Sequence, residues 1–480
     1  MADRFRVDPR GLAALRIALG LLLLADLVLR SRDLVVFYTD AGVLPRAVLT
    51  ETFGGLAALS FAHGLSGSPY VQGFLFAVAM LAAVALIIGY HTRLATLVSF
   101  LLLVSLQTRN PVLLNAGDSL LRRLMFWGFF LPLGGRWSVD AVRGARRAEP
   151  FSSVATAALL LQVLIVYLVN AVLKLRGEAW RSGEAILLVF QVDQLTVRLG
   201  DILAEFPVLL EGLGWLWLAL LVASPLLVLL WGWPRALFAG LFASMHLGMA
   251  LTMRLGLFPL ISIAGLLPFV PPRVWQSLVG HFAPAVREGL QIQDCLWRLD
   301  DWLPRLPRPQ IGAGARHRLR QLGSVLVALL LAGVLFWNAA GLGYATVPAD
   351  VQRIADPTER RWDMFAPSPR TNDGWFVAPG ELASGELVDA YGGGPLSWDR
   401  PPDLASSYPS HRWFVYMLEL PRPGTGPLRA AFADYLCRRW NANHETTLRT
   451  VRLVYVLEPA VLDGNESTRR VDLGQYECPA

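Results

Sequence analysis

Long apolar runs restrict this chain to a membrane fold more strictly than any other feature. A helix needs about 20 residues to cross a hydrocarbon core of about 30 Å, and nine runs approach that length. They cover residues 11–29, 70–90, 93–107, 118–133, 152–173, 207–232, 235–253, 256–271 and 321–341. Hydrophobic residues make up 54% of the chain and charged residues only 17%, which is too apolar for a soluble protein of this size. We therefore predict a polytopic α-helical protein of about nine spans, with the lipid bilayer as its main partner.

The arginines predict how these spans are oriented. Four arginines lie in the loop 134–149 and eight in the segment 272–320. If nine spans alternate in direction, both segments lie on the same side as the N-terminus, and the excess of arginine marks that side as cytoplasmic. Everything after about residue 345 is then extracytoplasmic. The net charge of +6 is accordingly a topology signal. No nucleic-acid partner is expected, because no basic stripe with stacking aromatic residues accompanies the charge.

The chain changes character near residue 345, which predicts a helical membrane domain over 1–344 and a soluble domain over 345–480. The second part is rich in Pro, Gly, Asp and Arg. Its runs 411–420 and 447–459 predict strands, and 426–442 predicts an amphipathic helix. We expect a small extracytoplasmic domain of α+β or mostly β structure.

The three cysteines fall on both sides of the predicted membrane. Cys437 and Cys478 lie in the outer domain, where an oxidising compartment permits a disulfide but does not require one. Cys295 lies in a cytoplasmic segment and should stay reduced. No His/Cys cluster has the spacing of a zinc site, so no metal is expected.

Polar residues inside apolar runs are costly and are candidates for function. Tyr167, Asn170 and Lys174 are three, four and seven residues apart, which places them on one face of a helix. Arg16 and Asp26 are separated by about 15 Å along a helix, so each is expected to find its partner on another span. Three further candidates lie in or next to apolar runs, namely Asp118, His246 and Arg254.

Lys174 stands out because the chain has 43 lysines and arginines together and this residue is the only lysine. One interpretation is a snorkelling lysine, with its stem in lipid and its amine among the headgroups. An arginine would snorkel equally well, however. Lysine differs because a desolvated ammonium can release its proton and become a neutral base, which a guanidinium does not. Both interpretations of Lys174 remain open from the sequence.

Several segments resemble, in the same order, the HTTM-type membrane domain that is shared with vitamin K-dependent gamma-carboxylase. They are FYTDAGVLPR (37–46), RWSVD (136–140), the stretch from Lys174 to Trp180 with Gly183, and HLGMALTMRLGLFPLISIAGLLPF (246–269). The outer segment RRWDMFAPSPRTNDGW (360–375) is similar to the segment on the C-terminal side of this domain in bacterial members. The resemblance covers about residues 9–275 and implies a bacterial HTTM protein.

The resemblance implies a specific chemistry for Lys174. In the carboxylase, a lysine at this place deprotonates reduced vitamin K, which then reacts with oxygen, and the resulting strong base allows carbon dioxide to add to a glutamate side chain. It implies reduced vitamin K or another quinol as a lipid-soluble cofactor, and an extracytoplasmic protein or peptide as substrate. The catalytic candidates are Lys174, Asn170, Tyr167 and His246, and the cofactor-binding candidates are Trp180, Arg254 and Phe258.

Two departures from the carboxylase concern a helper for the base and the binding of the substrate. Gly135 and Arg136 stand where the carboxylase has a histidine before its WSVD segment, and the soluble part of this chain is shorter. Two functions of different classes are therefore carried forward. One is a membrane enzyme that uses Lys174 as a base on a quinol to drive oxygenation and carboxylation. The other is a non-enzymatic scaffold or lipid-binding protein that displays the outer domain.

Overall fold

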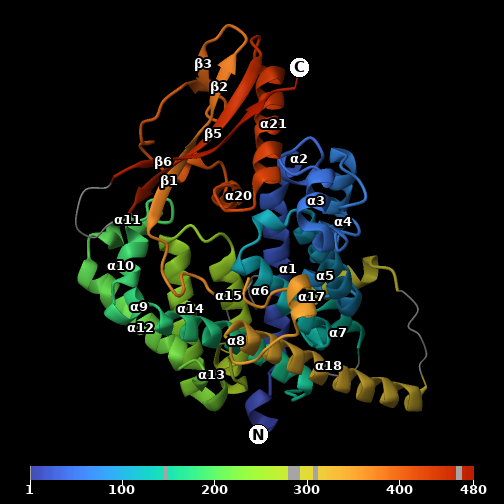
Figure 1. The fold of residues 1–480 in the computed structure, drawn as a ribbon. Helices are drawn as coiled ribbons and strands as arrows, with labels where there is room; N and C mark the ends of the chain where they lie inside the picture. Colours follow the sequence, from blue (N-terminus) through green and yellow to red (C-terminus); the bar gives the residue numbers. More distant parts are fainter. Residues whose placement is uncertain are drawn as a thin grey trace.

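The computed structural model describes residues 2–144, 149–278, 280, 292–305, 312–359, 361–460 and 467–479. Helices occupy the part before residue 345, and a sheet with two helices beside it lies at the opposite end from the N-terminus (Figure 1). The helices of the first part are α1 (Pro9–Ser31), α2 (Leu34–Tyr38), α3 (Arg46–Ala57), α4 (Pro69–Ile88), α5 (Thr92–Arg109), α6 (Ala116–Phe129), α7 (Val139–Arg143), α8 (Val154–Arg176), α9 (Glu178–Ser182), α10 (Ala185–Phe190), α11 (Leu199–Ala204), α12 (Pro207–Val222), α13 (Leu226–Leu229), α14 (Gly232–Thr252), α15 (Phe258–Leu266), α17 (Ile292–Trp302) and α18 (Ala313–Gly341).

Within the described residues, five helices are long and apolar enough to cross a membrane: α1, α4, α8, α14 and α18. A sixth span results if the segments Phe258–Phe269 and Pro272–Leu278, which are bent by 110° at their junction, are counted together. This agrees with a multi-pass membrane protein. The other expected spans fall on α5, α6 and α12, which are helical but do not meet the same criteria. The number nine, the orientation and the domain boundary therefore stay predictions.

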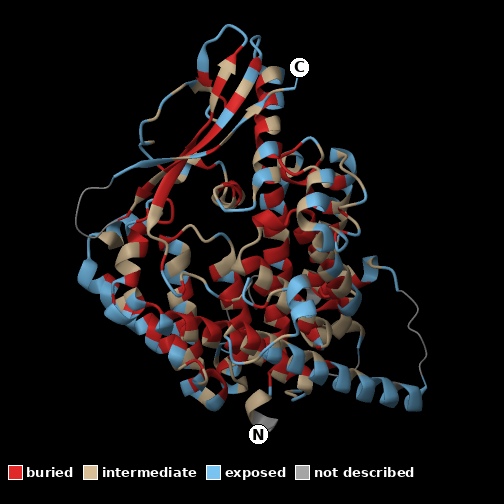
Figure 2. Ribbon diagram, in the orientation of Figure 1, coloured by how far each residue is buried: buried red, intermediate tan, exposed pale blue. Residues whose placement is uncertain are grey.

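Helix α8 lies at the centre of the helical part, and α18 lies at its edge (Figure 2). In the most apolar window of α8, 78% of the residues are buried, against 6% for α18. The sequence starts α8 with a capping box, in which the Ser153 and Thr156 side chains each accept a hydrogen bond from the other's backbone N–H. The helix ends at Arg176, and the N–H of the next residue, Gly177, caps it by donating to the carbonyl of Lys174. Lys174 is thus in the last turn of the most enclosed span.

The part after residue 345, which we call the outer domain after its predicted side of the membrane, contains a six-stranded sheet. Its elements are α19 (Ala349–Ile354), β1 (Asn372–Val377), β2 (Pro379–Leu382), β3 (Leu387–Asp389), β4 (Gly394–Pro395), α20 (His411–Glu419), α21 (Gly426–Asn443), β5 (Leu448–Pro459) and β6 (Arg469–Glu477). β5 is the central strand and pairs antiparallel with β1, β2 and β6. The expected strand over 447–459 and the expected helix over 426–442 are both confirmed, as β5 and α21.

The strand expected over residues 411–420 is wrong, because this stretch forms the helix α20. Ser410 caps the helix by accepting a hydrogen bond from the N–H of Trp413 at 3.3 Å. Trp413, Phe414 and Met417 recur at helical spacing, and their side chains are buried. Aromatic residues raise the strand propensity of the run, but burial of one helical face decides the structure.

Cys437 on α21 and Cys478, just after β6, form a disulfide, with 5.5 Å between their Cα atoms. It fastens the end of the chain to the helix that covers the sheet. The side chain of Cys295 lies outside the described part, so its reduced state stays a prediction.

The outer domain is joined to the helices by a buried cluster of ion pairs. Arg412 on α20 bonds to both carboxylate oxygens of Asp118, at 2.6 and 2.9 Å, and to Asp26 at 2.8 Å. Arg30 bonds to the same two carboxylates, at 2.7 Å to Asp26 and 2.5 Å to Asp118. Two guanidinium groups therefore share two carboxylates between α1, α6 and α20.

These contacts correct the expectation that Arg16 and Asp26 pair with other spans. Asp26 pairs with Arg30 one turn along its own helix and with Arg412 of the outer domain. Arg16 donates to the backbone carbonyl of Trp137, at 2.5 Å, in the loop before α7. Loops and the outer domain can supply these partners because they fold back against the helices, which span counting does not reveal.

Candidate functional site

Helix α8 carries Tyr167, Asn170 and Lys174 on one face, as their spacing predicts, because the segment is helical from Val154 to Arg176. All three side chains are buried, and that of Lys174 is 2% exposed. A snorkelling lysine would reach water or headgroups with its amine. The enclosed position of Lys174 does not fit that interpretation.

The amine of Lys174 is held by uncharged groups. Its Nζ atom donates to the backbone carbonyls of Met364 at 3.2 Å and Phe365 at 3.5 Å. It also lies 3.2 Å from the centre of the Trp180 ring, within the range of a cation–π contact. Among the described residues, no ion pair includes Lys174, so no carboxylate partner fixes its charge.

Residues 361–367, which we call the strap, bring these carbonyls to α8 from far along the chain. Asn170 donates from its side-chain amide to the carbonyls of Trp362 at 3.0 Å and Met364 at 3.1 Å. Trp180 donates from Nε1 to the Phe365 carbonyl at 2.7 Å. The strap therefore packs into the helical core, where Trp362 is 2% exposed.

Gly177 makes room for the strap directly after α8. A Cβ atom at this position would lie 1.8 Å from the carbonyl oxygen of Pro367, far closer than van der Waals contact permits. The backbone conformation of Gly177, with φ −84° and ψ 137°, is open to any residue. The requirement for glycine is therefore one of space.

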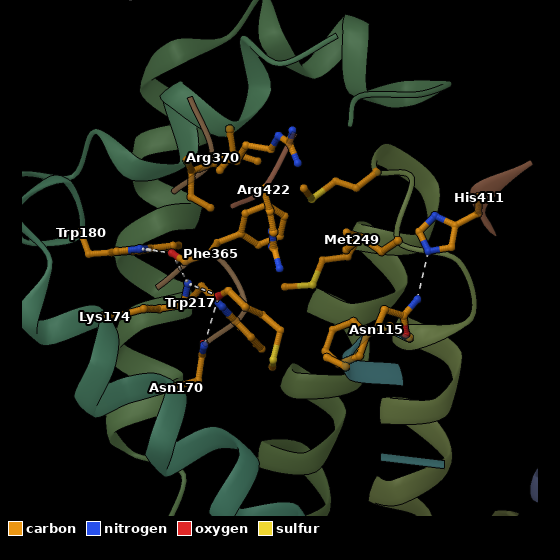
Figure 3. A pocket seen from close by; sticks show the side chains of 17 residues that line it. Asn115, Asn170, Lys174, Trp180, Trp217, Met249, Phe365, Arg370, His411 and Arg422 are labelled. Carbon is orange, nitrogen blue, oxygen red and sulfur yellow. Dashed lines mark hydrogen bonds between the residues drawn. The ribbon is translucent and has the colours of Figure 1, made fainter. Parts of the chain in front are cut away.

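A cavity of about 390 Å³ opens beside Lys174 (Figure 3). Its lining is mostly apolar and includes Trp217, Met249 and Phe258. Lys174, Asn170 and Trp180 lie together on one wall, and Asn115 and His411 lie on the opposite one (Figure 3). We call this space the lysine cavity. Its volume falls within the range of small-molecule sites, and a few convergent polar groups in an apolar lining are typical of them.

His411 belongs to the outer domain and bonds through Nε2 to the side-chain amide of Asn115 at 3.0 Å. Burial, together with the nearby guanidinium of Arg412, lowers the pKa of His411 to about 4. His411 is thus a neutral imidazole at pH 7. Arg370 and Arg422 add two guanidinium groups to the lining.

Tyr167 and His246, two of the expected catalytic residues, are brought together but do not line the lysine cavity. The hydroxyl of Tyr167 lies 3.2 Å from Nε2 of His246. The ring centre of His246 lies 5.4 Å from that of Trp217 and 5.7 Å from that of Phe258. Because Trp217 and Phe258 form the wall, the Tyr167–His246 pair supports it from behind.

Of the three expected cofactor-binding residues, two line the lysine cavity and one does not. Trp180 and Phe258 line the lysine cavity. Arg254 is not among its lining residues, since its guanidinium donates to the backbone carbonyls of Ala405 and Tyr408 in the outer domain. Arg254 therefore holds the outer domain in place, and its residue type alone does not reveal this.

Sequence reasoning does not single out most of the residues that complete the cavity. They are Asn115, Ala116, Ile186, Val189, Trp217, Met249, Met253, Leu255, Met364, Phe365, Arg370, His411 and Arg422. The outer segment 360–375 is a usable signal, because it resembles the family and contains the strap. No feature of the sequence near His411 indicates that it faces the cavity.

In the described part of the chain, no three His, Cys, Asp or Glu side chains gather as metal ligands would.

Comparison with known families identifies the helical part. The model of the HTTM domain matches residues 5–275, which is more than half of the chain and contains α1, α8, α14 and α15. Searches of curated proteins and of solved structures found no match. Together with the apolar helices, the match shows a multi-pass membrane protein. The chain belongs to the HTTM domain family.

Proposed function

We propose that this protein is an integral-membrane enzyme in which Lys174 accepts a proton from a lipid-soluble acid bound in the lysine cavity. The observation that carries the proposal is a buried amine without a carboxylate partner in the described residues, at the wall of a mostly apolar cavity. A positioned base contributes about 10²–10⁴-fold to a reaction rate. Lysine suits this role and arginine does not, because only lysine releases its proton readily.

A quinol is the class of acid that the family resemblance suggests, and the lining is compatible with it. Trp217 and Phe258 offer aromatic faces, and Met249 offers a flexible apolar side chain that adapts to a flat ring. A bound quinol supplies an acidic hydroxyl and, with oxygen, the oxidising chemistry that the resemblance to the carboxylase implies. The polar groups that would meet its oxygens are those of Lys174 and, across the cavity, Asn115.

Each residue around Lys174 has a defined part in this proposal. Lys174 accepts the proton at Nζ. Asn170 is a positioning residue, because its amide holds the strap carbonyls that bond to Lys174. Trp180 fixes the Phe365 carbonyl and covers the amine with its ring. The strap closes this wall of the site against water, which strengthens electrostatic interactions inside it.

The side of the membrane is part of the same proposal. The Cys437–Cys478 disulfide supports an oxidising, extracytoplasmic compartment for the outer domain. The N-terminus is then cytoplasmic, and a substrate reaches the lysine cavity from outside. Carboxylation of an extracytoplasmic protein or peptide is the reaction that the resemblance suggests.

The test uses purified protein in lipid nanodiscs with a reduced naphthoquinol, whose oxygen-dependent consumption is followed by absorbance. Lys174→Met keeps the length of the side chain but cannot accept a proton. We expect the rate to fall by about 10²-fold or more. Arg176→Met, two residues along the same helix, is the matched control and should keep the rate. An unchanged rate in Lys174→Met would refute the proposal.

A scaffold is the second candidate function, and one observation favours it. Both hydrogen bonds of Lys174 go to the strap, so the residue also fastens the outer domain to the helices. In this alternative Lys174→Met lowers stability, and no quinol is consumed by the unaltered protein. The nanodisc experiment therefore separates the two candidates.

A further inference from the structure

A second cavity, of about 610 Å³, adjoins the lysine cavity and differs from it in chemistry. The two cavities share Asn115, Ala116, Met364 and Arg422 in their linings. The lining of the second cavity is rich in polar groups, and four of them are arginines. They are Arg122, Arg123, Arg361 and Arg422. We call this space the arginine chamber.

The charges of the arginine chamber do not cancel. Besides the four guanidinium groups, the lining holds three carboxylates, those of Glu359, Asp363 and Glu419. One carboxylate is already engaged, because Glu419 pairs with Arg422 at 2.7 Å. The described lining thus keeps a surplus of positive charge, which attracts anions.

Three residues that line the chamber each carry a buried nitrogen donor without an acceptor in the described part of the chain. These donors are Nη1 of Arg123, Nε of Arg361 and Nε1 of Trp362. The guanidinium of Arg123 lies over the Trp362 ring, with 4.4 Å between its central carbon and the ring centre, so stacking orients its face. A buried donor without a partner is costly, and all three need the same complement, an oxygen acceptor.

Guanidinium groups are planar, always charged, and shaped for two-point bonding to carboxylate or phosphate. We propose that the arginine chamber binds the oxyanion group of a polar reactant, with Arg123, Arg361 and Trp362 as donors. The rest of that reactant passes Asn115 and Met364, which line both spaces, towards Lys174. This last step rests on the proposed function, whereas binding of the anion does not.

The experiment titrates the detergent-solubilised full chain calorimetrically with two probes, glutarate and inorganic phosphate, against chloride at equal ionic strength. The proposal predicts saturable binding of at least one probe, and the preferred probe tells a carboxylate from a phosphate. The double variant Arg123→Gln/Arg361→Gln should weaken binding by roughly tenfold or more. Trp362→Phe keeps the ring and removes one donor, so it should weaken binding several-fold. Arg353→Gln, at an exposed arginine of α19 outside the chamber, is the matched control and should bind as the unaltered chain does.

Absence of binding by both probes would overturn the proposal, and so would undiminished binding in the double variant. If the double variant does not fold, the result for Trp362→Phe decides: several-fold weaker binding supports the proposal, and undiminished binding overturns it. Anion binding that persists without any quinol consumption would refute the proposed function and leave the oxyanion site standing.

Discussion

Arg412 of the outer domain forms a two-point ion pair with Asp118 of the helical part, with N–O distances of 2.6 and 2.9 Å. The residues are 294 positions apart in the chain. Both side chains are almost entirely buried, with 11% of Arg412 and 3% of Asp118 exposed. This pair holds α20, and with it His411, against the wall of the lysine cavity.

Arg412→Met should reduce the free energy of unfolding by about 3–5 kcal/mol, because it leaves Asp26 and Asp118 buried with one cation between them. Denaturant titration in detergent micelles measures the change. Arg438→Met removes a pair with Asp434 in which both side chains are more exposed, at 43% and 35%, and should cost about 1 kcal/mol or less. Equal losses in the two variants would contradict the assignment of Arg412 as a buried link.

Gly177→Ala should displace the strap, because the added Cβ would meet the carbonyl oxygen of Pro367 at 1.8 Å. We expect a loss of about 1–3 kcal/mol in the free energy of unfolding, together with slower quinol consumption, since the carbonyls that bond to Lys174 move with the strap. Gly73→Ala on α4 is the control, because its Cβ would meet nothing within 4 Å. A Gly177→Ala variant with unchanged stability and rate would show that the strap is not held as described.

His411 should make the folded protein less stable as the pH falls. Its folded pKa is about 4 because the side chain is buried, whereas that of an unfolded histidine is near 6.5. Between these values the unfolded chain binds the proton more readily, so the free energy of unfolding falls as the pH drops from 6.5 towards 4, by on the order of 2 kcal/mol.

Unfolding titrations at pH 7 and pH 5 test this expectation in the unaltered chain and in His411→Gln, which keeps an acceptor for Asn115. The difference between the two pH values should shrink in His411→Gln. The exposed His317→Gln on α18 serves as control and should retain it. An equal pH dependence in all three proteins would rule out His411 as its source.

Reduction of the disulfide should destabilise the outer domain. It joins residues 41 positions apart, and closing a loop of that length stabilises the folded state by about 4 kcal/mol in the chain-entropy treatment. Cys437→Ser should therefore lower the unfolding temperature of the outer domain, as dithiothreitol should in the unaltered chain. Cys295→Ser should leave the unfolding temperature unchanged. Dithiothreitol should not lower the unfolding temperature of Cys437→Ser any further. A reductant effect of equal size in Cys437→Ser would contradict the prediction.

The sequence predicts those parts of the site that depend on one helix. The spacing of Tyr167, Asn170 and Lys174 requires only that α8 be continuous, and the capping box at Ser153 and the stop at Gly177 make it so. The strand β5 and the helix α21 are likewise foreseeable, because β5 is rich in β-branched residues and α21 is rich in Ala, Leu and Arg, which favour helices. The disulfide is permitted by topology, but only the fold brings its cysteines together.

The remainder of the site depends on contacts between segments far apart in the chain. Lys174 bonds to Met364, 190 residues away, through a backbone carbonyl that any residue type would supply. The family resemblance suggests Arg254 as a cofactor-binding residue, yet its hydrogen-bond acceptors are carbonyls of the outer domain. The residues of α20 predict a strand, because a short apolar run fits both the helical and the strand period. Only the fold shows which of its residues are buried together.

The most direct test of the central claim replaces the amine of Lys174 chemically. Lys174→Cys, in a Cys295→Ser background with the disulfide intact, is alkylated with either 2-bromoethylamine or (2-bromoethyl)trimethylammonium. The first restores a side chain of lysine length that can accept and release a proton, and the second gives a permanent cation. We predict that quinol consumption in nanodiscs recovers only with the amine, by about tenfold or more over the unmodified cysteine. Equal recovery with both reagents would show that Lys174 acts only through its positive charge, and would contradict its role as the base.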